Sequence, residues 1–446
     1  MADPFHAYDI RGIYNETVTE DVAYKVGRSY CRLFQPSRVV VGRDMRASSD
    51  PLAEALISGL RLGGCAVSDM GLASTDMMYL AVISHGFDGG FMVTASHNPA
   101  AYNGIKIVGK GAVPMGLGTG LERIATAVEG MKPFPTVPFQ AARSEFVFLD
   151  EYTDLLLTQV DTGALARIPL VIDAGNGMGG YAVDPLISRL DLKVERLYFE
   201  PDGSFPHHEA NPLINENRRD LEARVAGGSA QLGVGLDGDA DRAFFVDDEG
   251  HFASGDLLVG ILAGLALAKE PGAPITYCVR SSRFTQQRIL DLGGVPHMVK
   301  VGHAYAKKTM AEINAPFGGE VSGHYYYRFN GCWYDSGPLT ILKMLEVLGK
   351  NECGLKTMLE PTRDYFLSGE INSTVEEPQA VMDRIDQAYA SFPNRITIDG
   401  LRIESDDWWF SVRRSNTEPL FRLNCEGRTQ SVMERIRDEV LSLIRS

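Results

Sequence analysis

One local pattern occurs three times along the chain: an apolar, β-rich run, then a polar or glycine-rich loop, then an amphipathic helix. The three runs are Arg38–Asp44, Pro169–Gly175 and Pro274–Arg280, and the helices predicted after them span residues 51–62, 181–190 and 284–292. Units of this kind build sheets that are covered by helices. The sequence therefore predicts an α/β fold with three similar domains, each with a mixed sheet flanked by helices.

The character of the chain changes after about Asp364, where a smaller C-terminal α+β domain is expected. Its predicted elements are strands at 395–398 and 408–412 and a closing amphipathic helix at 432–444. A proline-rich connector at 132–138 and a turn at 247–250 favour boundaries further upstream. We expect four domains, which span residues 1–143, 144–248, 249–364 and 365–446.

Net charge, apolar runs and cysteine spacing limit the kinds of molecule that this protein can bind. The formal charge of −15 argues against nucleic acid and anionic membranes. No run approaches the ~18 apolar residues of a membrane span, and the first residues do not resemble a signal peptide. The six cysteines are too scattered for a zinc site or a disulfide framework. We expect a soluble, reduced, cytoplasmic protein, in which a phosphate ligand would need a local positive site.

A serine loop, Thr94–Pro99, directly follows an apolar run, so Ser96 is expected at the mouth of a buried strand. A serine hydroxyl is a weak nucleophile and needs a base, a metal or a strong donor to react. An ordinary turn after a strand is the alternative interpretation. Lys106 lies close enough in sequence to return to this loop, although a lone lysine is more often a solvated surface charge.

Three carboxylates at alternate positions, Asp237, Asp239 and Asp241, lie between two strand-like runs. An EF-hand is excluded because Arg242 and Asp248 stand where that loop needs Gly and Glu. Carboxylates packed this tightly repel one another, so they indicate a divalent cation rather than a solvated turn. Ligands that are all oxygen favour Mg²⁺ over zinc.

Two glycine-rich stretches suggest nucleotide binding. Gly175–Gly180 fits the GxGxxG pattern after a strand, with Glu200 further on, which leaves a dinucleotide site as an alternative. Gly104–Lys110 nearly matches a P-loop, but Gly111 replaces the Ser or Thr that would bind Mg²⁺.

Two further loops carry groups that can bind a phosphorylated sugar. Gly318–His324 offers a Glu and a Ser between glycines, and Arg413–Pro419 offers charged and neutral donors for a phosphate. Plain turns are the alternative interpretation of both.

Taken in order, these features resemble the α-D-phosphohexomutase family, specifically its phosphomannomutase/phosphoglucomutase branch. The serine loop and the aspartate run are highly specific as a pair, and the resemblance extends over nearly the whole chain. The matching stretches are Tyr8–Gly12, Thr94–Pro99, Asp173–Gly180, Pro201–Pro212, Asp237–Arg242, Gly302–His303, Gly319–His324 and Arg413–Pro419.

The resemblance implies four domains around a central cleft, each supplying one loop. Ser96 would carry the phosphoryl group and, with the three aspartates, would bind Mg²⁺. Residues that would line the site around the reacting atoms are Arg11, Lys106, Arg242 and His303. Residues that would bind the sugar hydroxyls or the non-reacting phosphate are Glu320, Ser322, His324, Arg413, Ser415, Asn416, Thr417 and Arg422.

The implied enzyme is an intramolecular phosphotransferase that interconverts hexose 6-phosphate and hexose 1-phosphate. Phosphoserine would donate its phosphoryl group, and a sugar 1,6-bisphosphate, also the expected activator, would reorient and return the other one. The 418–428 stretch favours mannose over glucose, while Val321 and Arg280 depart from common residues of the family. A phosphoglucosamine or N-acetylglucosamine mutase and a non-catalytic sugar-phosphate-binding protein remain alternatives. We expect a monomer or a homodimer.

Overall fold

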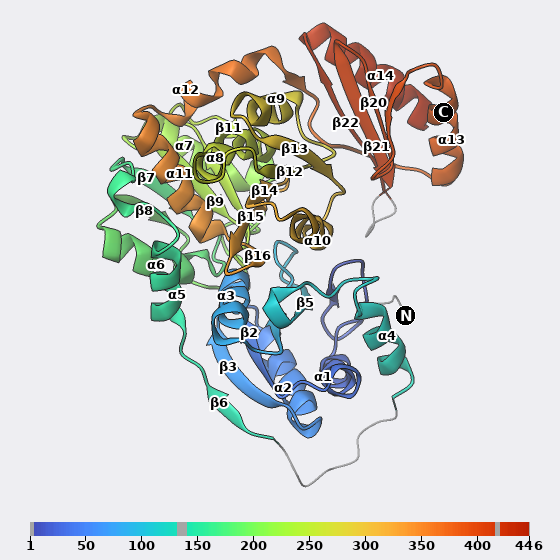
Figure 1. Cartoon of the computed structure of the whole chain (residues 1–446). Helices are drawn as coiled ribbons and strands as arrows, with labels where there is room; N and C mark the ends of the chain where they lie inside the picture. The colour runs from blue at the N-terminus through green and yellow to red at the C-terminus, as the bar shows by residue number, and fades with distance from the viewer. Residues whose placement is uncertain (1–3, 132–140, 415–419, 446) are drawn as a thin grey trace.

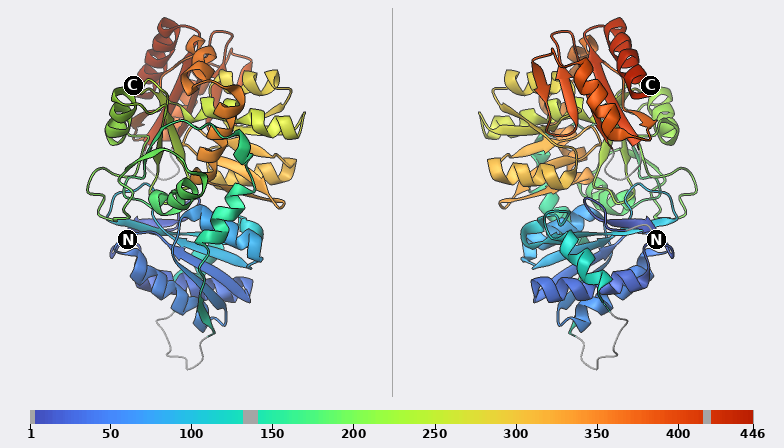
Figure 2. Two further views of the ribbon diagram at one scale, coloured as in Figure 1. Left: turned by 90° about the vertical axis from the view of Figure 1, so that its left-hand side faces the viewer. Right: turned by 90° about the vertical axis from the view of Figure 1, so that its right-hand side faces the viewer.

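The computed structural model describes residues 4–131, 141–414 and 420–445, and all structural statements below refer to these residues. Four sheets follow one another along the chain, each with its own helices (Figure 1). The blue N-terminal part lies at one end of the molecule and the red C-terminal part at the other, as both side views show (Figure 2). Among the described residues, no helix has the length and apolar character needed to cross a membrane.

The first sheet has the order β1-β5-β4-β2-β3-β6, with parallel pairing from β4 to β6 and antiparallel pairing of β1, β5 and β4. Its strands are β1 (Ile10–Ile13), β2 (Arg38–Arg43), β3 (Ala66–Leu72), β4 (Gly89–Val93), β5 (Tyr102–Gly109) and β6 (Arg143–Glu145). Its helices are α1 (Glu20–Phe34), α2 (Ser49–Leu62), α3 (Thr75–His85) and α4 (Leu121–Glu129). Helix α2 starts two residues earlier than predicted because Pro51 is tolerated in a first turn, where amides lack helical partners.

The second sheet has the order β11-β10-β9-β7-β8. Its strands are β7 (Leu170–Asp173), β8 (Val194–Leu197), β9 (Leu232–Leu236), β10 (Ala243–Val246) and β11 (Phe252–Ala253). The associated helices are α5 (Leu149–Leu157), α6 (Gly179–Leu190) and α7 (Arg219–Gly227). Because β9 and β10 pair in antiparallel fashion, the loop between them presents the three aspartates at the end of the sheet.

The third sheet has the order β13-β12-β14-β15-β16 and again mixes parallel and antiparallel pairs. Its strands are β12 (Pro274–Cys278), β13 (Val295–Val299), β14 (Phe317–Gly319), β15 (Tyr325–Phe329) and β16 (Cys332–Asp335). The associated helices are α8 (Gly255–Lys269), α9 (Arg283–Asp291), α10 (His303–Ile313), α11 (Gly337–Asn351) and α12 (Leu355–Leu359).

The fourth sheet is antiparallel, with the order β17-β22-β21-β20-β19 and β18 also paired to β22. Its strands are β17 (Phe366–Leu367), β18 (Ile371–Thr374), β19 (Asn394–Ile396), β20 (Leu401–Glu404), β21 (Trp408–Arg414) and β22 (Leu420–Gly427). Helices α13 (Pro378–Ala388) and α14 (Gln430–Arg445) complete this part. The predicted fold class, three α/β units followed by a smaller α+β unit, is confirmed.

Helix α3 joins the first unit to the next two. Its residues 77–82 are all buried, and they belong to one apolar core with side chains of the second and third sheets. A helix that is apolar on every side needs cover on every side. The buried Asp76 accepts hydrogen bonds from Tyr152 Oη at 2.7 Å and Ser336 Oγ at 2.5 Å, which fixes this contact between units.

Two expected boundaries differ from the structure by a few residues. Strand β6 contains Arg143 and pairs with β3, so the first unit continues past residue 143. The turn at 247–250 connects β10 to β11 within the second sheet, so it does not separate two units. The predicted connector at 132–138 lies outside the described residues.

Candidate active site

A cleft of about 430 Å³ lies between the four units and receives side chains from each of them. The predicted site residues that line it are Arg11, Lys106, Arg242, His303, Glu320, Ser322, His324, Arg413 and Arg422. Ser96 and the three aspartates are buried beside it, and the aspartates contact Lys106 and Arg242. Ser415, Asn416 and Thr417 lie outside the described residues.

Ser96 directly contacts the aspartate loop. Its Oγ donates a hydrogen bond to Asp237 Oδ2 at 2.9 Å, across 141 residues of sequence. Ser96 also has a φ of +51°, a left-handed conformation that is uncommon outside glycine and that costs free energy unless its surroundings hold it. The serine is therefore a positioned group rather than an ordinary turn residue.

Arg46 holds the serine loop in this shape, and the sequence analysis did not identify it. Its buried guanidinium donates to the backbone oxygens of Ser96 at 2.9 Å, Asn98 at 2.6 Å, Pro99 at 2.8 Å and Tyr102 at 3.1 Å. Its Nε lies 3.2 Å from Asp44 Oδ2, so the buried charge is paired. The planar fork of arginine donors suits such a set of carbonyls.

Glycines allow the serine and aspartate loops to touch. A Cβ on Gly238 would lie 2.4 Å from the backbone oxygen of Ser96, and a Cβ on Gly177 would lie 2.8 Å from the Cα of Gly238. The Met178 amide donates to the Gly238 oxygen at 2.8 Å. Gly177 of the GxGxxG stretch therefore packs against the aspartate loop. A Cβ on Gly180 would lie 2.2 Å from the Phe199 oxygen and one on Gly175 would lie 3.1 Å from Ala210, so packing within the second unit accounts for the three glycines without a dinucleotide.

The three aspartates form a group that fits a hard cation. Their carboxylate oxygens lie within 4.8 Å of one another, and all three side chains are buried. Asp239 Oδ1 and Asp241 Oδ1 have no hydrogen-bond partner among the described residues. Burial, reinforced by repulsion from Asp239 and Asp241, raises the pKa of Asp237 well above its usual value. An oxygen-only set with unpartnered oxygens suits Mg²⁺.

Lys106 and Thr75 position Asp239. Lys106 Nζ donates to Asp239 Oδ2 and Asp241 Oδ2, both at 2.5 Å, so it is a buried ion-pair partner and not a surface charge. Thr75, at the start of α3, donates to the same Oδ2 through its hydroxyl at 2.5 Å. Burial alone would lower the pKa of Lys106, but the attraction of Asp239 and Asp241 outweighs it and raises that pKa.

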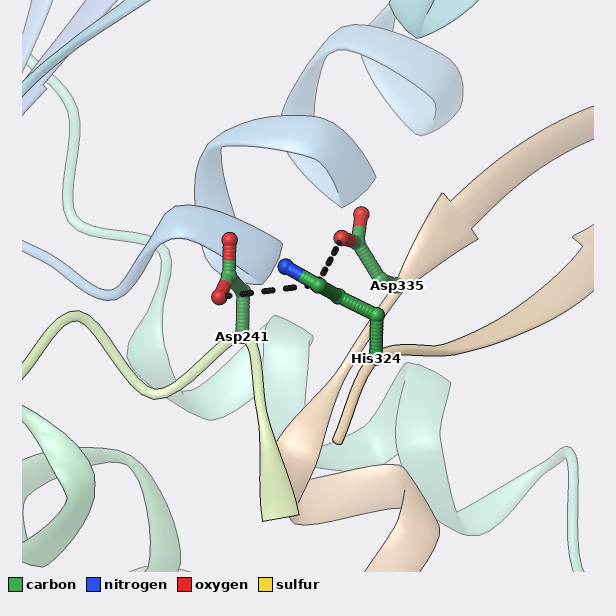
Figure 3. Close-up of side chains that lie close together, drawn as sticks. All are labelled: Asp241, His324 and Asp335. Carbon is green, nitrogen blue, oxygen red and sulfur yellow. Dashed lines mark ion pairs between the residues drawn. The ribbon is translucent and has the colours of Figure 1, made fainter. Parts of the chain in front are cut away.

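On the other side of the aspartate loop, Arg242 Nε lies 3.3 Å from Asp237 Oδ2. Figure 3 shows His324 between Asp241 and Asp335. The Nδ1 atom of His324 lies 2.8 Å from Asp335 Oδ2 and 3.8 Å from Asp241 Oδ1. Lys307 Nζ donates to the second oxygen of Asp335 at 2.7 Å. This chain of polar contacts connects the predicted metal site to the third sheet.

The predicted sugar loop is held by backbone and ring contacts. Glu320 accepts hydrogen bonds from the Gly302 amide at 2.7 Å and from Ser322 Oγ at 3.0 Å. The ring of His303 lies 5.8 Å from that of Tyr8 and 5.7 Å from that of His324. Burial, with Lys307 nearby, lowers the pKa of His303 well below its usual value, so this ring is neutral at pH 7.

The first strand places one more cation beside the serine loop. Arg11 in β1 donates to Asn98 Oδ1 at 2.6 Å and is also paired with Asp9. Its guanidinium therefore faces the loop that carries Ser96. The structure thus brings together every predicted reacting group that lies in its described ranges.

Arginines from two units meet at the part of the cleft that the fourth unit forms. Arg413 in β21 and Arg422 in β22 both pair with Glu370, at 3.2 Å and 3.0 Å. Arg280, which follows β12 in the third unit, pairs with the same carboxylate at 2.8 Å. The sequence analysis left Arg280 without a role and did not identify Glu370.

The site combines a buried serine hydroxyl, three carboxylates and, in the adjoining cleft, a cluster of arginines. This combination is typical of an enzyme that transfers phosphoryl groups. Comparisons with known proteins agree. The models for domains I, II, III and the C-terminal domain of phosphoglucomutase/phosphomannomutase match residues 3–132, 150–250, 254–365 and 370–443 in that order. The chain belongs to the phosphoglucomutase/phosphomannomutase family, as its sequence motifs indicated.

Relatives resemble the chain along its whole length. A phosphomannomutase of Escherichia coli is 38% identical over 451 residues, which cover 99% of both chains. A protein of Xanthomonas campestris pv. campestris described as phosphohexose mutases is 38% identical and covers 98% of each chain. Among solved structures, a family protein from Burkholderia thailandensis superimposes with a TM-score of 0.88 at 31% identity, covering 99% of this chain and 97% of that one. The expected class of enzyme, a phosphosugar mutase, is confirmed.

Proposed function

We propose that the protein interconverts hexose 6-phosphate and hexose 1-phosphate, with mannose preferred to glucose, through a phosphoserine at Ser96 and a sugar 1,6-bisphosphate. The observation that carries the proposal is the 2.9 Å contact between Ser96 Oγ and Asp237 Oδ2 inside a buried carboxylate trio. This trio lies beside a cleft whose lining also includes Arg280, Arg413 and Arg422, which suit a second phosphate.

Mg²⁺ fits the site, with Asp237, Asp239, Asp241 and phosphorylated Ser96 as its ligands. When bound, it would neutralise charge on the phosphoryl oxygens. The residues of the chain do the rest. Lys106 and Arg242 supply positive charge beside the three carboxylates at 2.5 Å and 3.3 Å. Such fixed charges stabilise a phosphoryl group in transit without reorganisation.

Proton transfer needs a group near the accepting sugar hydroxyl, and we assign it to His324. His324 lines the cleft and its Nδ1 lies 2.8 Å from Asp335 Oδ2, so Nε2 would be the nitrogen that takes the proton when the sugar oxygen bonds to phosphorus. As the bond between phosphorus and Ser96 Oγ breaks, the serine oxygen becomes free to regain a proton and to donate again to Asp237. The same groups serve the return step in reverse.

The non-reacting phosphate binds to Arg413 and Arg422, and Glu320 and Ser322 bind the sugar hydroxyls. The lining of the cleft, and the donors and acceptors on these side chains, support this assignment. Because the bisphosphate must turn end for end, the arginine site has to hold each of its phosphates in turn. Retention of the intermediate keeps water from taking the phosphoryl group.

The preference for mannose rests on relatives described as phosphomannomutases at 38% identity. A coupled assay with mannose, glucose and glucosamine phosphates, each with catalytic sugar bisphosphate, tests it. We expect kcat/KM to be highest for mannose phosphate. Mass spectrometry should show one phosphoryl group on the intact protein and should locate it on the peptide with Ser96. A protein that turns over none of these sugars, although it is folded and supplied with Mg²⁺ and bisphosphate, would refute the proposal.

A further inference from the structure

Glu370 occupies a central place in the arginine cluster. It lies in the short connection between β17 and β18, at the entry to the fourth unit. Its Oε2 receives Arg280 at 2.8 Å and Arg413 at 3.2 Å, and its Oε1 receives Arg422 at 3.0 Å. One carboxylate therefore connects an arginine of the third unit with two arginines of the fourth.

The three guanidinium groups would repel one another without this carboxylate. Arg280 and Arg413 are more than nine-tenths buried, so solvent screens their charges poorly. Burial, and next the proximity of Arg280, lowers the pKa of Arg413, which reflects this crowding. Burial alone would raise the pKa of Glu370, yet the pull of Arg280, Arg422 and Arg413 lowers it. The carboxylate thus stays ionised and neutralises one of three positive charges.

The cluster that remains matches a phosphate monoester in charge and in donors. Taken by themselves, the three guanidinium groups and Glu370 carry a net formal charge of +2, and a phosphate monoester carries about −2 at neutral pH. Each guanidinium carries five N–H donors and gives Glu370 only a small share of them. The Nε atoms of Arg280 and Arg413 are buried without a hydrogen-bond partner among the described residues.

We propose that Glu370 is a positioning residue for substrate binding: it holds Arg280, Arg413 and Arg422 at the spacing that the non-reacting phosphate requires. This inference rests on the proposed function and deepens it, because it adds Arg280 to the phosphate site and gives Glu370 a role. Glu370 acts through the arginines and takes no part in the chemistry at Ser96. A carboxylate that arranges cations in advance reduces the ordering cost of binding.

A competing role for Glu370 predicts the opposite change in substrate affinity when its charge is removed. If Glu370 were an internal competitor that substrate had to displace, neutralising it would strengthen binding. If it positions the arginines, neutralising it lets them separate and weakens binding. The Glu370→Gln variant keeps the shape of the side chain and removes its charge, so it separates the two roles.

Mannose 6-phosphate binding measured by calorimetry in a Ser96→Ala background, where no phosphoryl transfer occurs, gives the direct answer. We expect Glu370→Gln to weaken binding about tenfold and to raise KM similarly in the active enzyme, with kcat at saturation within about threefold, since ordering three side chains costs roughly this much. Glu370→Asp, which keeps the charge, should restore part of the affinity. A loss of stability alone would not raise KM while it leaves kcat nearly unchanged, and it would not be reversed by Glu370→Asp, which restores the charge.

Glu404→Gln is the matched control. Glu404 pairs with the buried Arg402 at 2.7 Å in the same fourth unit, and it does not line the cleft. Its loss should leave KM unchanged. Unchanged or tighter binding of mannose 6-phosphate in Glu370→Gln would overturn the inference. If the parent binds no hexose phosphate, the proposed function fails instead, and titration with inorganic phosphate then decides separately whether Glu370 arranges the arginines.

Discussion

Arg46 offers a sharp test of how the fold positions the reactive serine. Its guanidinium donates to four backbone oxygens of residues 96–102, at distances between 2.6 and 3.1 Å, and is paired with Asp44. Substitution by lysine keeps the positive charge but leaves only three donors on a single nitrogen. At least two of these five acceptors must therefore lose their partner.

Each buried acceptor left unsatisfied costs about 1–3 kcal/mol, so the loss of two partners in Arg46→Lys should destabilise this region by about 2–6 kcal/mol. The larger effect should be on catalysis. Ser96 is held at a φ of +51°, and a shift of about 1 Å in a reacting atom costs roughly 100-fold in rate. We expect kcat to fall by about that factor while KM changes little, because the substrate-binding arginines are untouched.

The assays are steady-state kinetics and amide hydrogen exchange of the peptide that covers residues 94–103, which should exchange faster in the variant. Arg61→Lys is the control, since Arg61 donates to one carbonyl, Ala141 O at 2.8 Å, in the same unit. It should leave both readouts near those of the parent. Exchange and kcat within about twofold of the parent in Arg46→Lys would show that the loop holds its shape without the guanidinium.

Four further outcomes are expected. Ser96→Ala should lose the phosphorylated species in intact mass and nearly all mutase activity while it keeps the thermal midpoint of the parent. Asp239→Asn should bind Mg²⁺ poorly in a calorimetric titration and lower kcat by orders of magnitude, and an enzyme indifferent to EDTA would contradict the metal site. Arg413→Ala should raise KM by roughly 10- to 100-fold, as expected for loss of a charged hydrogen bond of about 1.5–3 kcal/mol, with a stronger dependence on added bisphosphate. Burial raises the pKa of Asp76 to about 6, so the folded protein binds a proton that the unfolded chain releases above about pH 4; stability relative to Asp76→Asn should therefore be greater at pH 5 than at pH 7.5, by about 1–1.5 kcal/mol, in paired thermal melts.

Local sequence patterns were enough to predict the order and type of the main strands and helices. Apolar runs bounded by turn residues predicted β4, β9 and β10, and amphipathic spacing predicted α14 to within two residues at its N-terminus. Each of these signals depends on residues that are neighbours in sequence, and burial of one face supplies the physical reason. The boundaries at 143 and 248 were misplaced because a strand or hairpin that completes a sheet at its edge gives a weak local signal.

The supporting residues of the site could not be found in the same way. Arg46 lies 50 residues from Ser96, and Glu370 lies 90 residues from Arg280. Neither residue belongs to a motif with chemistry of its own, because each works by holding other groups in place. Charge offers no local signal either, since an isolated Arg or Glu in a loop is more often solvated. Such residues become recognisable once their burial and their partners are known.

The two charged regions of the cleft explain why one site can act on both ends of a sugar. In the proposed mechanism, the aspartates and their cations surround the group that reacts, and the interactions made there would change as the phosphoryl group moves. We propose that the cluster of Arg280, Arg413 and Arg422, which surrounds Glu370, contacts only the phosphate that is not reacting. Its interactions would then be the same before and during transfer. Uniform binding of this kind lowers KM without raising kcat. A bisphosphate that turns end for end presents an equivalent phosphate to this cluster in both orientations, and one set of catalytic residues therefore serves both half-reactions.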